Sequence, residues 1–477
     1  MSEKSWNLPS LKLAQQRTKT QTKIEKSLFI IEPNMQNMGV GKSYFLRTYG
    51  CQANERDGES IAGILEQMRF TQVATPEEAD IIILNTCAVR KNAEDKVLGE
   101  LGMLKKLKKS NPDLIFALCG CMAQEEEVVN LLLQKYRHVD LIFGTHNIHR
   151  LPTLLYNVLM NREKTVEVFS QEGEVVENMP VKRFGAHKAW VNIMYGCDKF
   201  CTYCIVPYTR GKERSRVMED ILSEIEILKA EGFKEITLLG QNVNSYGKDL
   251  DLEDGFASLL EAVAKTGIER VRFTTSHPWD FSEAMIDVIA KYENIMPFIH
   301  LPVQSGDDAM LKIMGRRYTI EHYKSLYDKI IERIPNCAFS TDIIVGFPNE
   351  TEEQFQKTLD IVDYCQYDNA YTFIYSPREG TPAAKMEDNV ALEVKQERLQ
   401  RLMDRTNHYA NLKNKNYVGK VCKVLVDGPS KKNKNIYSGY SEENKLVNFV
   451  MKEAKAGDIV NVKITDAKTW TLDGEQI

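Results

Sequence analysis

The sequence lacks the features that mark membrane and secreted proteins. No apolar run in the 477-residue chain approaches the ~20 residues of a membrane-spanning helix. Near the N-terminus the only apolar stretch is residues 28–31, which is shorter than the ~7–15-residue core of a signal peptide. The net charge is only −5, so any RNA partner would have to be bound by local basic patches. The sequence therefore predicts a cytoplasmic protein with no membrane partner.

The cysteines are the most informative part of the composition. Hydrophobic residues make up 43% and charged residues 27% of the chain, as in soluble globular proteins, and the length suits two to four domains. Seven of the ten cysteines lie in the first 204 residues. In a reducing compartment, clustered cysteines are more often metal ligands or catalytic groups than disulfides. The other three, Cys337, Cys365 and Cys422, lie in apolar or helical patterns and are expected to be small buried hydrophobes.

The pattern of the first half predicts a parallel sheet. Residues 1–42 are polar and lack periodicity, so we expect a mobile extension. Between residues 43 and 162 short apolar runs alternate with helical segments. The expected strands are 44–46, 81–84 and 114–118, and the expected helices include 58–68 and 93–109. Apolar strands between helices indicate a parallel sheet covered on both faces. Residues 163–187 are polar and irregular and are interpreted as a linker.

The second half predicts a partial β/α barrel and then a small β-barrel. Between residues 188 and 415 the expected strands are 190–194, 235–239, 270–274, 298–301, 339–345 and 370–375. The expected helices there include 218–230, 323–333, 352–364 and 392–414. In β/α barrels the chemistry lies at the C-terminal ends of the strands. In residues 416–477 the expected strands are 421–426, 445–450, 459–464 and 469–472, with turns at Asp427-Gly428 and Asp473-Gly474. The predicted fold class is α/β.

Three cysteines follow the first predicted barrel strand in a C-x3-C-x2-C pattern. Cys197, Cys201 and Cys204 therefore lie on one loop. Soft thiolates favour zinc or an iron–sulfur cluster. Three thiolates leave one iron of a four-iron cluster without a protein ligand, and this iron is then free to bind a small molecule. The alternative is a zinc site with a fourth ligand elsewhere.

A second set of cysteines follows the first three strands of the N-terminal sheet. Cys51, Cys87 and Cys121 each lie just beyond a strand, and the carboxyl ends of parallel strands converge on one crevice. Cys119 directly ends an apolar strand and is expected to be buried, whereas Cys121 follows Gly120 and can turn outward. We therefore prefer Cys121 as the third ligand. The alternative is three unrelated structural cysteines.

Polar residues at the ends of the barrel strands are candidates for ligand binding. These residues are Gln241, Asn242, His277, Gln304 and Asp342. The alternative for each is a hydrogen bond that shapes its loop. Arg316 is a similar candidate on a helical stretch.

Two basic regions are candidates for anion or RNA binding. The loop 208–216 holds four cations, Arg210, Lys212, Arg214 and Arg216, which suit phosphate or carboxylate groups unless the loop is simply solvated. Residues 411–477 hold 12 Lys against 8 Asp plus Glu. They also hold three aromatic residues for stacking, Tyr437, Tyr440 and Phe449. The small barrel therefore predicts an RNA-binding module, with a structural cap as the alternative. Lys105, Lys106, Lys108 and Lys109 are interpreted as a charge-matched helix end.

The motif 195–204, with Tyr203 just before its last cysteine, resembles the radical S-adenosylmethionine (SAM) superfamily. Together with the N-terminal cysteines, nearly the whole chain beyond residue 42 resembles the methylthiotransferase family of that superfamily. Further matching segments are 239–247, 275–278, 301–306, 341–348 and 376–383. Ala53 and Gly315 depart from the family pattern, but neither is a proposed ligand. The resemblance implies an N-terminal methylthiotransferase domain, a radical SAM core and a C-terminal TRAM domain, which is taken as an RNA-binding module.

The resemblance also implies cofactors and an activity. Cys197, Cys201 and Cys204 are expected to hold a [4Fe–4S] cluster that binds SAM and cleaves it to a 5′-deoxyadenosyl radical. Cys51, Cys87 and Cys121 are expected to hold a second [4Fe–4S] cluster that carries the sulfur to be inserted. Tyr203 and the five strand-end residues are expected to contact SAM or substrate.

The activity expected from the resemblance is addition of a methylthio group to C2 of an isopentenyl-modified adenosine at position 37 of tRNA, next to the anticodon. An electron donor such as a flavodoxin or ferredoxin is expected as a partner. One alternative is a sister methylthiotransferase that acts on a threonylcarbamoyl-modified adenosine or on a ribosomal protein. An alternative from another class is a non-catalytic iron–sulfur scaffold that binds RNA.

Overall fold

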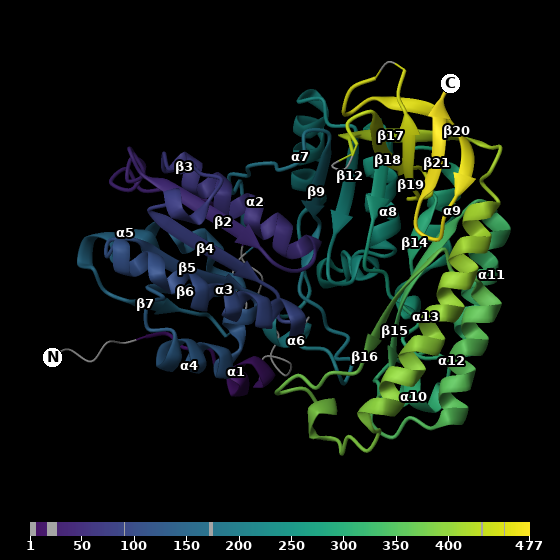
Figure 1. The fold of residues 1–477 in the computed structure, drawn as a ribbon, viewed down its shortest axis with the longest axis horizontal. Coiled ribbons are helices and arrows are strands. Elements are labelled where there is room, and N and C mark those ends of the chain that lie inside the picture. The colour runs from purple at the N-terminus through teal and green to yellow at the C-terminus, as the bar shows by residue number, and fades with distance from the viewer. Residues whose placement is uncertain (1–5, 17–25, 90, 171–174, 431–432, 453) are drawn as a thin grey trace. The chain divides into compact units, whose positions relative to one another are not determined.

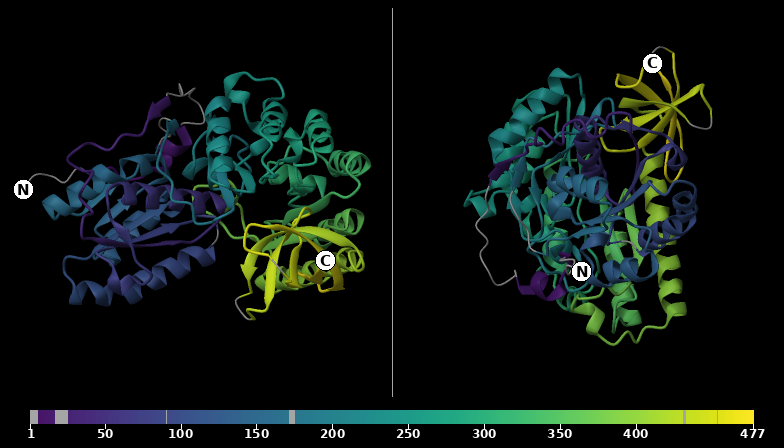
Figure 2. Two further views of the ribbon diagram at one scale, coloured as in Figure 1. Left: turned by 90° about the horizontal axis from the view of Figure 1, so that it is seen from above. Right: turned by 90° about the vertical axis from the view of Figure 1, so that its left-hand side faces the viewer.

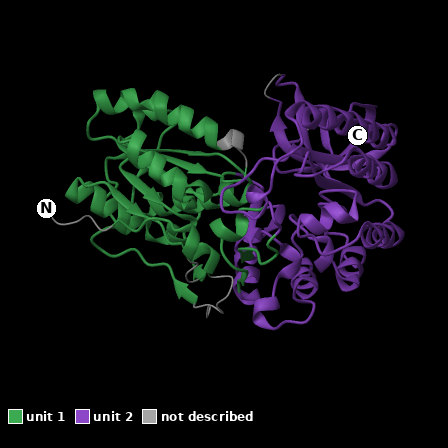
Figure 3. Ribbon diagram, turned by 90° about the horizontal axis from the view of Figure 1, so that it is seen from below, with its two compact units in different colours: residues 1–184, 194–200, 204–216 green, residues 185–193, 201–203, 217–477 purple. Residues whose placement is uncertain are grey.

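The protein divides into two compact units (Figure 3). The structure, a computed structural model, describes residues 6–16, 26–89, 91–170, 175–430, 433–452 and 454–477. Unit 1 comprises residues 1–184, 194–200 and 204–216, and unit 2 comprises residues 185–193, 201–203 and 217–477. Within the described residues, no helix is both long and apolar enough to cross a membrane.

Unit 1 is built on a six-stranded parallel sheet with helices on both faces (Figure 1). The strand order is β3 (Thr71–Gln72), β2 (Ser43–Thr48), β4 (Ile81–Thr86), β5 (Ile115–Gly120), β6 (Leu141–Phe143) and β7 (Thr165–Glu167). The helices are α2 (Gln52–Gln67), α3 (Lys91–Ser110), α4 (Glu126–Lys135) and α5 (Leu151–Asn161). Ile81 and Ile83 pack with α2 and α5, whereas Ile82 and Leu84 pack with α3 and α4. This alternation explains why β4 is apolar at every one of these positions.

Two segments of unit 1 are more ordered than the sequence indicated. In the expected polar extension 1–42, α1 (Leu11–Gln16) forms a helix, and β1 (Lys26–Leu28) pairs in parallel with β8 (Val175–Glu177). Ile31 and Met35 from the same segment are buried in the core beside α2 and α5. The expected linker 163–187 contributes β7, the edge strand of the main sheet. Strands of three residues and isolated apolar residues are too short to produce a detectable hydrophobic periodicity, so the sequence did not predict them.

Unit 2 contains the expected partial β/α barrel. Its six parallel strands form two sheets, β13 (Arg270–Phe273), β12 (Glu235–Leu239) and β9 (Lys188–Asn192), and β14 (Phe298–His300), β15 (Ala338–Val345) and β16 (Asn369–Ile374). The helices between them are α7 (Met218–Ala230), α8 (Gly255–Lys265), α9 (Glu283–Lys291), α10 (Asp308–Ile313), α11 (Ile320–Arg333) and α12 (Glu352–Cys365). Every strand lies within two residues of its predicted bounds.

The last part of unit 2 is the long helix α13 (Leu392–Lys415) and a closed five-stranded barrel (Figure 2). The barrel order is β17 (Val421–Pro429), β18 (Ile436–Ser441), β19 (Leu446–Val450), β21 (Leu472–Gln476) and β20 (Ile459–Ala467). Neither predicted Asp-Gly turn is a turn, because Gly428 lies at a register shift within β17 and Gly474 lies within β21. Strand β18 was not expected. A Cβ at Gly439 of β18 would lie 2.2 Å from the Leu425 carbonyl oxygen, so the close packing there requires glycine. Glycine is unfavourable in strands, and its presence makes the sequence of β18 less typical of a strand.

Two arginines attach this barrel to the N-terminal ends of β12 and β13. Arg270 and Arg272 donate to four backbone carbonyls of the barrel, those of Lys423, Tyr440, Ser441 and Glu442, over 2.7–3.0 Å. Arg272 Nε also donates to Glu235 Oε2 over 2.8 Å, and all three charged side chains are buried. Charged donors satisfy the barrel's carbonyls at this buried contact.

Candidate functional site

The N-terminal cysteines follow three adjacent strands of the unit 1 sheet. Cys51 is the N-cap residue of α2 and follows β2, Cys87 directly follows β4, and Cys121 directly follows β5. Because β2, β4 and β5 are neighbours and parallel, the three cysteines lie at one edge of the sheet.

Gly120 separates the roles of the two cysteines beside it. Its φ is +93°, and a Cβ there would lie 2.4 Å from the Thr86 carbonyl oxygen, so the turn after β5 requires glycine. Before the turn, Cys119 is fully buried in the core with α2 and α5. After it, Cys121 packs with Ala88 at the carboxyl edge of the sheet. This geometry supports Cys121 as the proposed ligand.

The thiols of this set interact with one another. A hydrogen bond between Cys51 and Cys87 lowers the pKa of Cys51 to about 5 and raises the pKa of Cys87. Burial raises the pKa of Cys121. Within the described residues, no three His, Cys, Asp or Glu side chains are grouped to hold a single metal ion. A set of three mutually close thiols matches the donor type of an iron–sulfur cluster, whose thiolates bind separate irons.

A buried arginine reaches the same set. Arg210 Nε donates to Cys121 Sγ over 3.1 Å, and Arg210 Nη2 lies 2.7 Å from Asp57 Oδ2 on α2. Both charged side chains are only 8% exposed. A cationic donor beside a cysteine sulfur favours the thiolate that a metal cluster requires, so these residues fit such a group.

The C-x3-C-x2-C motif follows a short antiparallel strand pair in unit 1, β10 (Met194–Tyr195) with β11 (Arg214–Ser215). Gly196 has φ +79°, and a Cβ there would lie 1.9 Å from the Lys212 carbonyl oxygen. Next to it, the Cys197 amide donates to the Gly211 carbonyl over 3.0 Å. Cys197 and Cys204 are half-buried. Glycine at 196 thus allows the cysteine segment to lie closely against the segment that follows it.

The middle cysteine of the motif lies in unit 2 beside a second arginine. Cys201 is buried, and Arg316 Nη1 donates to its Sγ over 3.4 Å. Arg316 also donates to the Pro302 carbonyl and the Tyr318 hydroxyl. The ring of Tyr203 packs edge-on against the ring of Phe347, with centroids 6.3 Å apart. This contact within the protein holds the Tyr203 side chain in place.

Asn242 and His277 are both tied into loops at the ends of β12 and β13. Asn242 Nδ2 donates to Ser245 Oγ over 2.7 Å and to Asp280 Oδ2 over 2.8 Å. The amide oxygen of Asn242 is buried and has no hydrogen-bond partner in the described part of the chain. His277 is buried, and its Nδ1 accepts from the Trp279 amide. Asn242 therefore retains an acceptor for a ligand.

Gln304 and Asp342 are joined by a backbone hydrogen bond. The Gln304 amide donates to the Asp342 carbonyl over 2.9 Å, and Gln304 has φ +68°. Left-handed backbone at a residue other than glycine is strained, and such strain clusters at functional sites. The Asp342 carboxylate lies 3.5 Å from His300 Nε2. Gln241, two residues beyond the end of β12, is half-buried.

The loop 208–216 differs from its prediction. Arg210, Arg214 and Arg216 are buried and Lys212 is half-buried, so this part of the chain is not a solvated basic loop. Arg216 makes a two-pronged ion pair with Glu177, at 2.8 and 2.7 Å. Since the acidic partners are distant in sequence, no local pattern indicates this burial.

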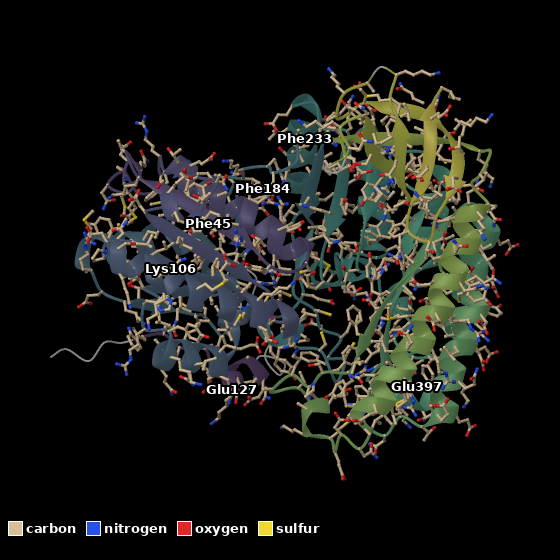
Figure 4. All side chains as sticks on the ribbon, in the orientation of Figure 1. Phe45, Lys106, Glu127, Phe184, Phe233 and Glu397 are labelled. Atoms are coloured by element: carbon tan, nitrogen blue, oxygen red, sulfur yellow. The ribbon has the colours of Figure 1, made fainter. Side chains whose placement is uncertain are left out.

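The stacking residues of the small barrel were also predicted incorrectly in part. Phe449 is buried in the barrel core, and the Lys188 ammonium lies 4.7 Å from the centroid of the Tyr440 ring. In the described part of the barrel, Trp470 is exposed, at 58%, and the sequence interpretation missed it. Elsewhere, Lys106 is exposed on α3 (Figure 4), and Lys108 pairs with Asp140. These contacts agree with a charged helix end.

Comparisons with known proteins cover nearly the whole chain. Residues 191–362 match the radical SAM superfamily, residues 43–144 the uncharacterized protein family UPF0004, and residues 415–477 the TRAM domain. A protein of Bacillus mycoides named tRNA-2-methylthio-N(6)-dimethylallyladenosine synthase is 57% identical over 100% of this chain and 93% of its own length. A Bacillus cytotoxicus protein of the same name is also 57% identical, over 98% of this chain and 92% of its own length.

A solved structure shares the fold. The radical S-adenosylmethionine methyltransferase TsrM from Kitasatospora setae aligns with a TM-score of 0.53 and 14% identity, over 72% of this chain and 77% of that one. At this identity the likeness concerns the fold alone.

Proposed function

Because the chain belongs to the radical SAM family of tRNA-2-methylthio-N(6)-dimethylallyladenosine synthases, we propose that it methylthiolates C2 of N6-dimethylallyladenosine at position 37 of tRNA. The observation that carries this proposal is 57% identity over the full length of the chain, with both cysteine sets present. When bound, two [4Fe–4S] clusters and SAM supply the radical and the sulfur that substitution at an unactivated carbon requires.

The cysteines divide the work between two sites. Cys197, Cys201 and Cys204 hold the cluster that binds SAM, and Cys51, Cys87 and Cys121 hold the cluster that provides sulfur. The contacts at Cys121 and Cys201 support a ligand role for both sulfurs, because each accepts a hydrogen bond from a buried arginine.

SAM and the substrate base are bound by Tyr203 of the cysteine loop and by residues at the ends of the barrel strands. The proposed residues are Tyr203, Gln241, Asn242, His277, Gln304 and Asp342. The unpaired amide oxygen of Asn242 and the strained backbone of Gln304 favour this role.

The small C-terminal barrel contributes binding of tRNA. Lysines are exposed on it at several positions, Lys420, Lys423, Lys452, Lys463 and Lys468. Exposed Trp470 offers a ring for stacking on an unpaired base, which is how RNA loops are commonly bound. We place the reaction in the cytoplasm, with electrons from a flavodoxin or ferredoxin.

Mass spectrometry of tRNA nucleosides from a deletion strain tests the substrate. We expect the methylthiolated nucleoside to disappear and N6-dimethylallyladenosine to accumulate. If a methylthiolated threonylcarbamoyladenosine or ribosomal protein disappears instead, the sister activity is correct.

Two variants test the division between the cysteine sets. Cys201→Ala should abolish 5′-deoxyadenosine formation from SAM, whereas Cys87→Ala should retain abortive cleavage and lose methylthiolation. Absence of 5′-deoxyadenosine from fully loaded native protein would instead favour the non-catalytic scaffold. A normal rate of product formation by Cys87→Ala would contradict the division.

A further inference from the structure

One ion pair in unit 1 belongs to the cysteine site yet has no assigned role. Arg210 Nε donates to Cys121 Sγ, and Arg210 Nη2 pairs with Asp57. The thiol and both charged side chains are buried, and Arg210 lies six residues beyond Cys204. A single guanidinium therefore links the segment after one cysteine motif to a cysteine of the other.

The position of Arg210 is fixed from several directions. It follows the short helix α6 (Val206–Thr209), and its own carbonyl accepts a hydrogen bond from Arg214 Nη2 over 3.2 Å. The hydroxyl of Thr145 donates to the Thr209 carbonyl over 2.7 Å. Ile205 and Tyr208 pack with Ala88 and Cys121. Asp57 completes the arrangement, so the guanidinium is held on the sulfur rather than free to sample solvent.

A charged donor on a ligating sulfur affects the electronic state of the cluster it binds. Hydrogen bonds to the sulfurs and the net charge nearby help to set the reduction potential of an iron–sulfur cluster. Partners outside the ligand set orient the ligands and tune the metal. Burial strengthens these effects because the surrounding dielectric constant is low. Adding an electron makes a cluster more negative, so a nearby cation favours reduction and a nearby anion opposes it.

We propose that Arg210 and Asp57 are positioning residues that set the reduction potential of the cluster held by Cys51, Cys87 and Cys121. Arg210 raises the potential through its hydrogen bond to Cys121, and Asp57 lowers it while holding Arg210 in place. The inference rests on the proposed function, since it requires a cluster at these cysteines.

The test uses the full chain with Cys197, Cys201 and Cys204 all changed to Ala, so that one cluster site remains. The protein is loaded anaerobically with iron and sulfide, both are quantified, and the cluster is titrated with a reductant while its electron paramagnetic resonance signal is followed. For Arg210→Gln in this background we expect the ratio of reduced to oxidised cluster at a fixed potential to fall about tenfold. For a one-electron couple this corresponds to a potential about 59 mV lower.

The sign of the shift separates the proposal from a merely structural role. Asp57→Asn should move the potential upward, and the double variant Arg210→Gln/Asp57→Asn should lie near the starting protein. Arg216→Gln is the matched control, because Arg216 is also buried in this segment and paired with a carboxylate, that of Glu177. It should leave the potential unchanged.

The outcomes are distinguishable. Equal potentials in all variants, or shifts of the same sign for Arg210→Gln and Asp57→Asn, overturn the inference while leaving the proposed function intact. If Arg210→Gln takes up no iron, Arg210→Lys is titrated instead. It retains the charge without the planar fork, and we expect a smaller downward shift. Failure of the background protein itself to bind iron and sulfide contradicts the proposed function.

Discussion

Replacing Arg272 with methionine is expected to release the C-terminal barrel from the rest of unit 2. Arg272 donates to the carbonyls of Ser441 and Glu442 over 2.7 and 3.0 Å and pairs with Glu235 over 2.8 Å. The side chains of Arg272 and Glu235 are 8% and 7% exposed. Methionine fills similar volume but leaves Glu235 and two carbonyls without their main donor.

The magnitude follows from burial. Removing one partner of a buried ion pair costs about 3–5 kcal/mol, because the other charge is left without compensation. Arg270 stays 3.8 Å from Glu235 and offers partial compensation, so we take the lower end, about 3 kcal/mol. A change of this size increases the population of the detached barrel by on the order of a hundredfold.

Limited trypsin digestion measures this population. Lys415 and Lys420 are exposed at the junction of α13 and β17, where opening gives the protease access. When cleavage follows the opened state, its initial rate scales with that state's population, so we expect an increase of about a hundredfold. The tRNA affinity should fall as well, whereas 5′-deoxyadenosine formation should persist.

Two further variants make the test decisive. Arg333→Met removes an exposed pair with Asp287 on neighbouring helices and should cost about 0–1 kcal/mol. The double variant Arg272→Met/Glu235→Met should recover most of the loss, since it removes the unpaired charge. If Arg272→Met resists trypsin as well as Arg333→Met does, Arg272 does not hold the barrel.

The remaining predictions concern the cysteines and the barrel surface. Cys121→Ala should reduce the iron bound at the N-terminal site, whereas Cys119→Ala should retain it; equal iron loss in both variants would exclude the choice of ligand. Trp470→Ala should weaken tRNA binding by about 1–3 kcal/mol in a filter-binding assay, with most of the affinity kept in Trp470→Phe. Phe449→Ala should instead lower the unfolding free energy in urea by about 3–5 kcal/mol, because Phe449 fills the barrel core. A folded Phe449→Ala protein of native stability would contradict that placement.

Strands β4 and β5 of the unit 1 sheet were predictable from sequence because burial on both faces leaves a continuous apolar run, whereas β3 and β6 of that sheet were not predicted. Residues 81–84 are isoleucine or leucine throughout, and β12 has its predicted bounds. Strand β18 was missed because its sequence, IYSGYS, contains serine and glycine in place of an apolar run. Gly439 is needed there because another strand's backbone lies close to it. Edge strands such as β7 are missed for a related reason, since three residues carry no alternation.

The candidate site was predictable only in its cysteines. Their positions follow from where strands end, and a thiol just beyond a parallel strand lies at the functional edge of a sheet. The burial of Arg210 and Arg216 was not predictable, because a cation in a polar loop looks the same in the sequence whether it is solvated or buried. Asp57 and Glu177 decide the burial of Arg210 and Arg216, and only the tertiary fold brings them together.

Both cysteine sets have an arginine that donates to a cysteine sulfur, but the charge around that arginine differs between them. Each has a sulfur that accepts a hydrogen bond from a buried arginine, Arg210 at Cys121 and Arg316 at Cys201. Arg210 is paired with Asp57, so its charge is largely compensated. Among the described residues, the other hydrogen-bond partners of Arg316 are a carbonyl and a hydroxyl, which leave its charge uncompensated. An uncompensated cation favours reduction more strongly than a neutral pair does. With clusters bound as proposed, we therefore predict a higher reduction potential for the cluster of Cys197, Cys201 and Cys204 than for that of Cys51, Cys87 and Cys121.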